Sequence, residues 1–304
     1  MSRSGLSAPR PRSRSGRLDR AWSILYAAPA VALVLAFLAY PLVRVFGYAL
    51  TSWNGVGPAA WVGLRNFSGL VHDPVFLAAL RNNVIYAISV PVEVIGALVI
   101  AHLLYERVPG WKVFRSAFFL PAVYSTVVIG IIAGVTLQAN GPIDNSMRSV
   151  GLSVLARNWL GSAVDARIAI IAIVIWANFG YSVLIYLAGM SALDPQLAEA
   201  ARLDGAGSWY ILFRVHGPNL RGVMQLVLVI NTVTAFAYMF AYIYTITNGG
   251  PGTSTESIST EIYDTAFVLF ETGRASALGN ISVFVVIVLT RLYFQAIQLR
   301  KEAA

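Results

Sequence analysis

The sequence predicts an all-α membrane protein with six transmembrane helices. Of its 304 residues, 57% are hydrophobic and only 12% are charged, and the mean hydropathy is +0.68. Apolar runs of about 20 residues are long enough to cross the hydrocarbon core as helices. The chain contains six such runs, and the first, third, fourth and fifth hold no charged residue. The predicted spans are Trp22–Val43, Val84–Leu104, Ala117–Gln138, Ile168–Met190, Gly222–Thr247 and Ala275–Leu299.

Three of these spans need separate justification. The first follows a basic tail, as a signal peptide would, but its apolar run is too long and continues through Tyr40-Pro41 without a small-residue cleavage site. The second contains Pro91, which is expected to free a backbone carbonyl and to kink the helix near Glu93. The sixth contains Arg291, whose long side chain can reach the nearer membrane surface. All three are therefore retained as spanning helices.

The distribution of charge predicts how the chain lies in the membrane. The net charge is +8, and residues 1–20 carry six arginines, so they are expected to form a disordered basic tail near anionic lipid. Basic residues gather on the side of both termini, and the positive-inside rule then places both termini and residues 194–218 in the cytoplasm. Residues 21–304 are predicted to form one membrane domain. The last external loop is acidic, with Glu256, Glu261, Asp264 and Glu271 against Arg274.

The polar segment 194–218 predicts a hairpin that begins with a short capped helix. Asp194 is a good N-cap, and Pro195 suits the first helical position because its missing N–H is not needed there. The run Leu197–Leu203 favours helix, and Gly205 can adopt the left-handed turn that closes it.

The second helix of the hairpin is predicted over Trp209–His216. Ser208 is expected to cap it, and Gly217-Pro218 is expected to end it. A rigid, capped hairpin of helices at the membrane surface is suited to mechanical coupling with another protein.

Several kinds of chemistry are absent from the sequence. There is no cysteine, which excludes disulfides and thiolate sites. His72, His102 and His216 are scattered, so no metal site is predicted, and His102 is expected to form structural hydrogen bonds. The glycine-rich run Asn248–Thr255 lacks the lysine of an ATP-binding loop and lies on the external side. We therefore predict that the chain is not an enzyme, and that energy for uphill transport comes from an ion gradient or from another subunit.

The hairpin carries a motif that resembles a known family. Glu199-Ala200-Ala201, then Asp204-Gly205-Ala206, then Pro218 nineteen residues after the glutamate, resemble the EAA signature of membrane subunits of bacterial binding-protein-dependent ABC importers. The run Thr247-Asn-Gly-Gly-Pro251 is similar to that of the carbohydrate-uptake group, which includes the maltose and glycerol-3-phosphate permeases. One departure is His216, which stands near a position where aliphatic residues are common.

The resemblance implies a type I ABC importer permease fold in the cytoplasmic membrane of a bacterium. The implied partners are a second homologous permease, two ATPase subunits that bind ATP and magnesium, and an extracytoplasmic substrate-binding protein. No cofactor in this chain and no nucleic acid is expected. In the family the EAA hairpin docks into a cleft of the ATPase, whose closure drives alternating access. The implied coupling residues are Glu199, Ala200, Ala201, Asp204, Gly205, Ala206 and Pro218. The alternative is that Glu199 and Asp204 are ordinary solvated charges and that the alanines only favour helix.

Polar and aromatic groups at mid-membrane depth are candidates for a sugar pathway. An ionisable residue within a span is a functional candidate by default, although Glu93 can equally be a structural carboxylate, and the aromatic residues can simply pack helices together. The candidates are Glu93, Asn178, Tyr181, Asn231, Phe236, Tyr238 and Met239. The Gly249-Gly250-Pro251 loop can face the binding protein or be a plain turn.

The predicted function is therefore the permease subunit of an ATP-driven importer for a sugar, oligosaccharide or related polyol ester. One alternative is a secondary transporter driven by an ion gradient, which needs an acidic site, and Glu93 is the only carboxylate within a span. A second alternative is the same permease role for another solute, such as a glycerol phosphate ester. A membrane-embedded enzyme is the third, and no catalytic cluster supports it. The sequence does not name the sugar.

Overall fold

The structure is a computed structural model that describes residues 26–153 and 156–302, with side chains up to residue 295. The predicted basic tail, residues 1–20, lies outside the described residues. Backbone contacts divide the chain into two compact units, Met1–Gly47 and Tyr48–Ala304.

The described part of the first unit is a single apolar helix. This helix covers Tyr26–Tyr48 and is long and apolar enough to cross a membrane. It includes a π-helical turn over Leu35–Ala39 and continues into α2 (Tyr40–Tyr48). None of its side chains is buried, which suits a helix whose surroundings are lipid or another chain.

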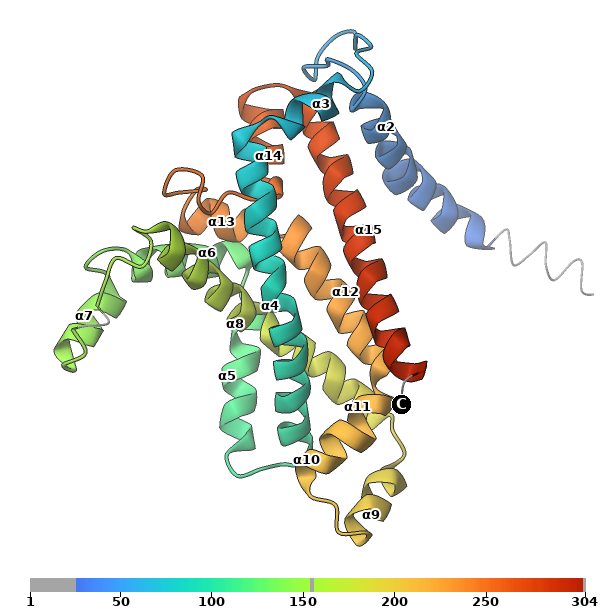
Figure 1. Ribbon diagram of the computed structural model, residues 1–304, viewed down its shortest axis with the longest axis vertical. Coiled ribbons are helices and arrows are strands. Elements are labelled where there is room, and N and C mark those ends of the chain that lie inside the picture. Colours follow the sequence, from blue (N-terminus) through green and yellow to red (C-terminus); the bar gives the residue numbers. More distant parts are fainter. Residues whose placement is uncertain (1–25, 154–155, 303–304) are drawn as a thin grey trace, which may run out of the picture. The chain divides into compact units, whose positions relative to one another are not determined.

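The second unit is a helical bundle, and its described residues form no β-strand beyond the isolated bridge between Thr51 and Trp61. Figure 1 shows α4 in the middle of this unit, where it packs against α3, α5, α8, α12 and α14. The longer helices are α4 (Pro74–Tyr105), α5 (Trp111–Val123), α6 (Thr126–Leu137), α8 (Ala163–Ser191), α12 (Arg221–Ala237) and α15 (Thr272–Glu302). The shorter ones are α3 (Arg65–Val71), α7 (Pro142–Ser149), α9 (Pro195–Leu203), α10 (Ser208–Tyr210), α11 (Gly217–Asn219), α13 (Phe240–Ile246) and α14 (Ile258–Tyr263).

Two predicted spans are broken helices. The predicted helix Ala117–Gln138 is wrong as a continuous element, because α5 and α6 meet at 105°. The predicted helix Gly222–Thr247 is also wrong, because α12 ends at Ala237 and α13 packs separately against α6. Four helices among the described residues can span a membrane, or six if each of two bent pairs counts as one span: α5 with α6, and Ser208–Asn219 with α12. Residues 222–247 are one apolar run in the sequence, but because α13 packs against α6 they form two helices and not one.

The core of the second unit lies where α4, α8 and α12 meet. Tyr186, Met190 and Phe236 are fully buried there. The α4 helix continues through Pro91 without a break, because neighbouring helices packed around a spanning helix offset one missing backbone hydrogen bond. The first residue of α4, Pro74, follows Asp73, whose carboxylate accepts the N–H of Val75 at 2.7 Å.

Candidate functional site

The first helix of the hairpin forms as the sequence predicts. Asp194 caps α9, and its carboxylate accepts the N–H of Gln196 at 3.0 Å. Pro195 occupies the first helical position, and the helix ends at Leu203. Gly205 has a φ of +84°, which is the left-handed turn expected of it. Local capping chemistry therefore determines this element.

The second helix differs from the prediction at both ends. Its N-cap is Gly207, because the Ser208 hydroxyl is bonded to His102 instead of to the helix backbone. The helix also continues past Gly217-Pro218 to Asn219. Gly217 N–H donates to Leu212 O, five residues back, and this wider π-helical turn accommodates the proline ring. The chain then bends by 79° into α12.

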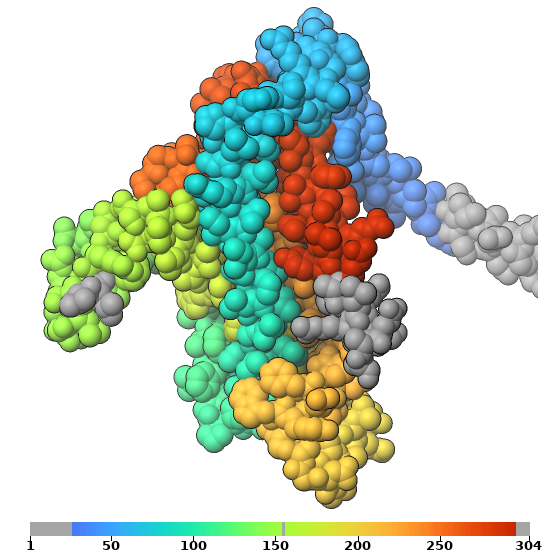
Figure 2. Space-filling view, in the orientation of Figure 1, coloured from blue at the N-terminus to red at the C-terminus, as the bar shows by residue number. Residues whose placement is uncertain are grey.

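The hairpin exposes apolar and acidic groups together. Figure 2 shows it as a yellow and orange lobe at one end of the second unit. Leu203 is 90% exposed, and Glu199 and Asp204 are also exposed. An open groove of about 610 Å³ runs between the helices, lined by Ala201, Asp204, Gly205, Ala206, Gly207, Tyr210, Arg214 and Val215. Exposed apolar surface rimmed by polar groups is typical of a protein interaction site.

Two side chains at the end of α4, His102 and the C-cap residue Glu106, hold both helices of this hairpin. Arg202 on α9 donates two hydrogen bonds to the Glu106 carboxylate, at 2.5 and 2.6 Å. His102 Nε2 lies 2.8 Å from Ser208 Oγ, and His102 Nδ1 lies 3.2 Å from His216 Nδ1. Both imidazoles are buried, which confirms the structural hydrogen-bonding role expected of His102.

The opposite end of the second unit carries the Gly-Gly-Pro loop, which is ordered by its own hydrogen bonds. Thr255 is fully buried, and its hydroxyl donates to Gly250 O at 2.7 Å and lies 2.8 Å from Thr247 Oγ1. Gly249 is buried with a φ of +81°, while Pro251 is exposed. The tip of the loop is thus available on the surface while its base is fixed.

Two polar side chains in the first part of α4 hold this loop, and a third holds the helices next to it. Asn82 Nδ2 donates to the carbonyls of Thr253 and Glu256, at 3.1 and 2.9 Å. Tyr86 Oη donates to Thr255 O at 2.9 Å. Asn83 links two further elements: its Nδ2 donates to Ala235 O on α12 at 2.7 Å, and its Oδ1 accepts the N–H of Ile258 on α14 at 2.8 Å.

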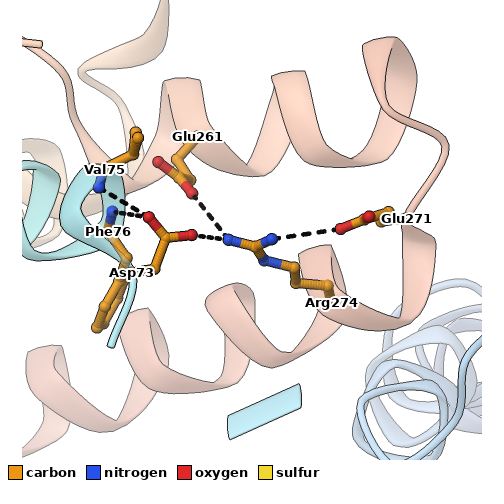
Figure 3. Close-up of polar contacts among 6 residues, drawn as sticks. All are labelled: Asp73, Val75, Phe76, Glu261, Glu271 and Arg274. Carbon is orange, nitrogen blue, oxygen red and sulfur yellow. Dashed lines mark hydrogen bonds and ion pairs between the residues drawn. The ribbon is translucent and has the colours of Figure 1, made fainter. Parts of the chain in front are cut away.

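An acidic cluster surrounds one arginine at the same end. Figure 3 shows Arg274 of α15 facing Asp73, Glu261 and Glu271. Its guanidinium pairs with Asp73 and lies 3.9 Å from Glu261 and 3.4 Å from Glu271. Burial, together with the nearby charges of Glu256 and Asp264, raises the pKa of Glu261 to about 7. An open pocket of about 630 Å³ adjoins the cluster.

Three of the predicted pathway residues, Glu93, Asn231 and Met239, line one small cavity, and the other four do not. Glu93 is buried, and its carboxylate accepts the Ser182 hydroxyl at 3.3 Å, while Asn231 Nδ2 donates to that hydroxyl at 3.1 Å. Phe236 and Met239 are buried in the core. The other three are Asn178, which bonds to Val174 O of its own helix, and the exposed Tyr181 and Tyr238. Their role in a pathway stays a prediction.

The chain matches, over residues 3–302, the family described as binding-protein-dependent transport system inner membrane components. The chain belongs to this family. The match covers both broken spans and the hairpin, so the family's membrane domain accounts for nearly the whole sequence.

Named relatives within this family are similar along most of their length. The probable ABC transporter permease protein YurN of Bacillus subtilis is 34% identical over 91% of this chain and 96% of its own. The lactose transport system permease protein LacF of Rhizobium radiobacter is 31% identical over 91% of this chain and 94% of its own.

A solved structure supports the fold assignment. A chain of a bacterial ABC transporter involved in the import of alginate superposes with a TM-score of 0.75 at 24% identity, covering 93% of this chain and 98% of that one. The bent helix pairs therefore belong to an ABC importer permease fold.

Sequence reasoning missed the residues that attach the hairpin and the loop to α4. Glu106 and Arg202 are 96 positions apart, and His102 and His216 are 114 apart, so no local pattern reveals either pair. The one available signal was His216, a polar residue near a position where aliphatic residues are common.

Proposed function

We propose that this chain is a permease subunit of an ATP-driven, binding-protein-dependent importer for a sugar or oligosaccharide. The observation that carries the proposal is the exposed hairpin of α9–α11, which presents Glu199, Asp204 and Leu203 outside the bundle while Glu106 and His102 fasten it to the central helix. Family membership supports this function, and so do relatives named for lactose, multiple sugars and diacetylchitobiose.

The hairpin is the proposed docking site for an ATPase subunit in the cytoplasm. ATP and magnesium bind to that subunit, and this chain contributes shape and attachment. Closure of two ATPase subunits pushes the hairpin, and the helices attached to it change the side from which the pathway is open. A second homologous permease completes the pathway, which suits the exposed aromatic side chains of Tyr181 and Tyr238.

The Gly-Gly-Pro loop is the proposed contact for an extracytoplasmic binding protein. Its base is fixed to α4, and Pro251 stands exposed at its tip. A solved relative in fold was captured with an alginate pentasaccharide-bound periplasmic protein, with a TM-score of 0.76. A pre-ordered loop favours docking because little chain entropy is lost on binding.

An ion-gradient mechanism has less support. Glu93 is 3% exposed and its carboxylate accepts the Ser182 hydroxyl, so it serves as a hydrogen-bonding group between α4 and α8. The space beside it measures only about 10 Å³, which is at the lower limit for one water molecule.

Reconstituted transport tests the proposal. The chain is co-purified with its ATPase, second permease and binding protein and placed in proteoliposomes. We expect sugar uptake to require ATP and to continue when proton and sodium gradients are collapsed. Uptake without ATPase subunits that follows an ion gradient would contradict the proposal. Parallel assays with glycerol 3-phosphate address the alternative raised by a relative named for that substrate, which is 29% identical.

Glu199→Lys and Gly205→Pro test the hairpin itself. Glu199→Lys reverses an exposed charge, and Gly205→Pro cannot adopt the φ of +84° seen at this turn. We expect both variants to insert normally and to lose the ATPase subunit or substrate-stimulated ATP hydrolysis. Glu271→Lys, the same charge reversal at the opposite end, is the control and should retain the ATPase. Unchanged transport by both hairpin variants would remove the coupling role.

A further inference from the structure

The two helices of the hairpin, α9 and α10–α11, are called the first and second coupling helices. Both are fastened to the C-terminal end of α4, at positions four residues apart. Glu106, the residue that ends α4, holds Arg202 of the first coupling helix, and His102 holds the second. Residues four positions apart lie on the same face of a helix, so one face of α4 carries both attachments.

His102 contacts the second coupling helix at two points. Its Nε2 reaches Ser208 Oγ at the first residue of that helix, and its Nδ1 reaches His216 Nδ1 at the end of the π-helical segment. The two contacts are eight residues apart, so together they set both the position and the direction of this helix. The edge of the His216 ring also meets Tyr105 of α4, with ring centroids 5.7 Å apart.

The chemistry of the three groups requires specific protons. One Nδ1 must donate and the other must accept, and the Ser208 hydroxyl can act in either way. With neutral rings, two arrangements satisfy both contacts, and in each of them His102 uses both ring nitrogens. A residue with one polar atom cannot make both contacts. The position therefore requires the two ring nitrogens of the imidazole and not only a side chain of its size.

Burial of the two imidazoles favours their contact with each other over contacts with water. His102 is 0% exposed and His216 is 4% exposed, and the neighbouring Leu212 and Leu104 belong to the main core of the unit. Between the two rings, no water readily replaces a lost partner, whereas Ser208 is exposed and its hydroxyl can bond to water. The exposed Arg202–Glu106 pair alone would be a weak attachment, because surface ion pairs contribute little.

We propose that His102 is a positioning residue for energy coupling, which fastens the second coupling helix to α4 so that the hairpin and α4 move as one body. The proposal rests on the coupling function proposed above for the hairpin. It adds that the direction of the second helix is set by a histidine–serine–histidine contact, and that this contact stays closed while the transporter changes state.

The first test measures coupling in the complete reconstituted transporter. His102→Leu removes both contacts, and Ser208→Ala removes one. His102→Gln retains a polar group that can reach Ser208. We expect His102→Leu to lower sugar transported per ATP hydrolysed at least fivefold, with ATPase subunits still bound, Ser208→Ala to lower it less, and His102→Gln to recover part of the loss. His72→Leu is the control, because His72 is exposed on a loop, and it should leave the ratio unchanged.

The outcomes separate this proposal from the coupling function itself. If His102→Leu transports with the wild-type ratio while Glu199→Lys does not, the positioning role is wrong and the coupling function stands. If Glu199→Lys is also unaffected, both are wrong. A loss in His102→Leu that His102→Gln does not relieve at all, or that His72→Leu reproduces, overturns the specific role of the imidazole.

If His102→Leu fails to assemble, a second test asks whether the hairpin and α4 move as one body. The chain has no cysteine, so Glu106→Cys and Arg202→Cys introduce its only thiols. A short bifunctional thiol reagent then joins α4 to α9 in the assembled transporter, and treated wild-type complex is the control for thiols of the partners. We expect the cross-linked transporter to retain most of its ATP-driven uptake. Loss of uptake on cross-linking, restored by cleaving the link, would show that the two segments separate and would overturn the proposal.

Discussion

At the scale of single residues, the acidic cluster around Arg274 predicts a pH-dependent stability. Glu261 is 6% exposed, and burial with the charges of Glu256 and Asp264 raises its pKa from 4.5 to about 7. Arg274, 3.9 Å away, is already paired with Asp73. A carboxyl with a raised folded-state pKa binds its proton more tightly when folded, so stability falls as pH rises from about 4.5 to about 7 and is then constant.

Glu261→Gln should reduce this pH dependence. The amide stays neutral, so the variant should be more stable than the wild type at pH 8, by on the order of 1–2 kcal/mol after solvent screening, and equal to it at pH 4. Thermal unfolding between pH 4 and pH 8 measures the difference. Glu271→Gln, at the half-exposed member of the cluster, should retain the wild-type slope. An unchanged slope in Glu261→Gln would assign the titration to Glu256 or Asp264, whose pKa values burial also raises.

At the scale of helices, the sequence predicted elements whose ends depend on local chemistry and failed where packing decides. The start and end of α9 follow from Asp194-Pro195 and Gly205, because caps act on the adjacent backbone. The break between α12 and α13 has no comparable signal, because hydropathy predicts which residues lie within the membrane but not where a helix changes direction. Likewise, the EAA-like motif could be identified from its residues. Its attachment through His102 and Glu106 could not, because it depends on contacts between segments about a hundred positions apart.

The approach of α5 to α8 depends on one glycine. A Cβ at Gly180 would lie 2.2 Å from the backbone oxygen of Phe118. Gly180→Ala must therefore push α5 away from α8, and such overpacking typically costs about 1–3 kcal/mol. We expect a lower midpoint of thermal unfolding in the purified permease. Gly279→Ala is the matched control, because nothing lies within 4 Å of its Cβ and alanine favours helix, so its midpoint should stay the same or rise. An equal effect of both substitutions would contradict this contact.

At the scale of the whole second unit, α4 is the element common to the two ends that are proposed to dock partners. It has 32 residues, which at 1.5 Å per residue is about 48 Å. Near its beginning, Asn82 and Tyr86 hold the Gly-Gly-Pro loop and Asn83 holds the start of α14, which follows the loop; His102 and Glu106 hold the hairpin at its end. A helix fastened at both ends can carry a displacement from one face of the membrane to the other.

Asn83→Leu tests this connection where α4 meets α12 and the start of α14, directly after the loop. The substitution leaves Ala235 O and the N–H of Ile258 without their buried partner, at about 1–3 kcal/mol for each unpaired group. We expect the ATPase subunits to remain bound and basal hydrolysis to persist, while stimulation by the sugar-loaded binding protein falls at least fivefold. Asn145→Leu is the control, because Asn145 is exposed and bonds only to the nearby Asn140 O. Full stimulation in Asn83→Leu would mean that the link from Asn83 to α12 and α14 is not needed for the signal, since the α4 contacts at Asn82, Tyr86, His102 and Glu106 are untouched in this variant.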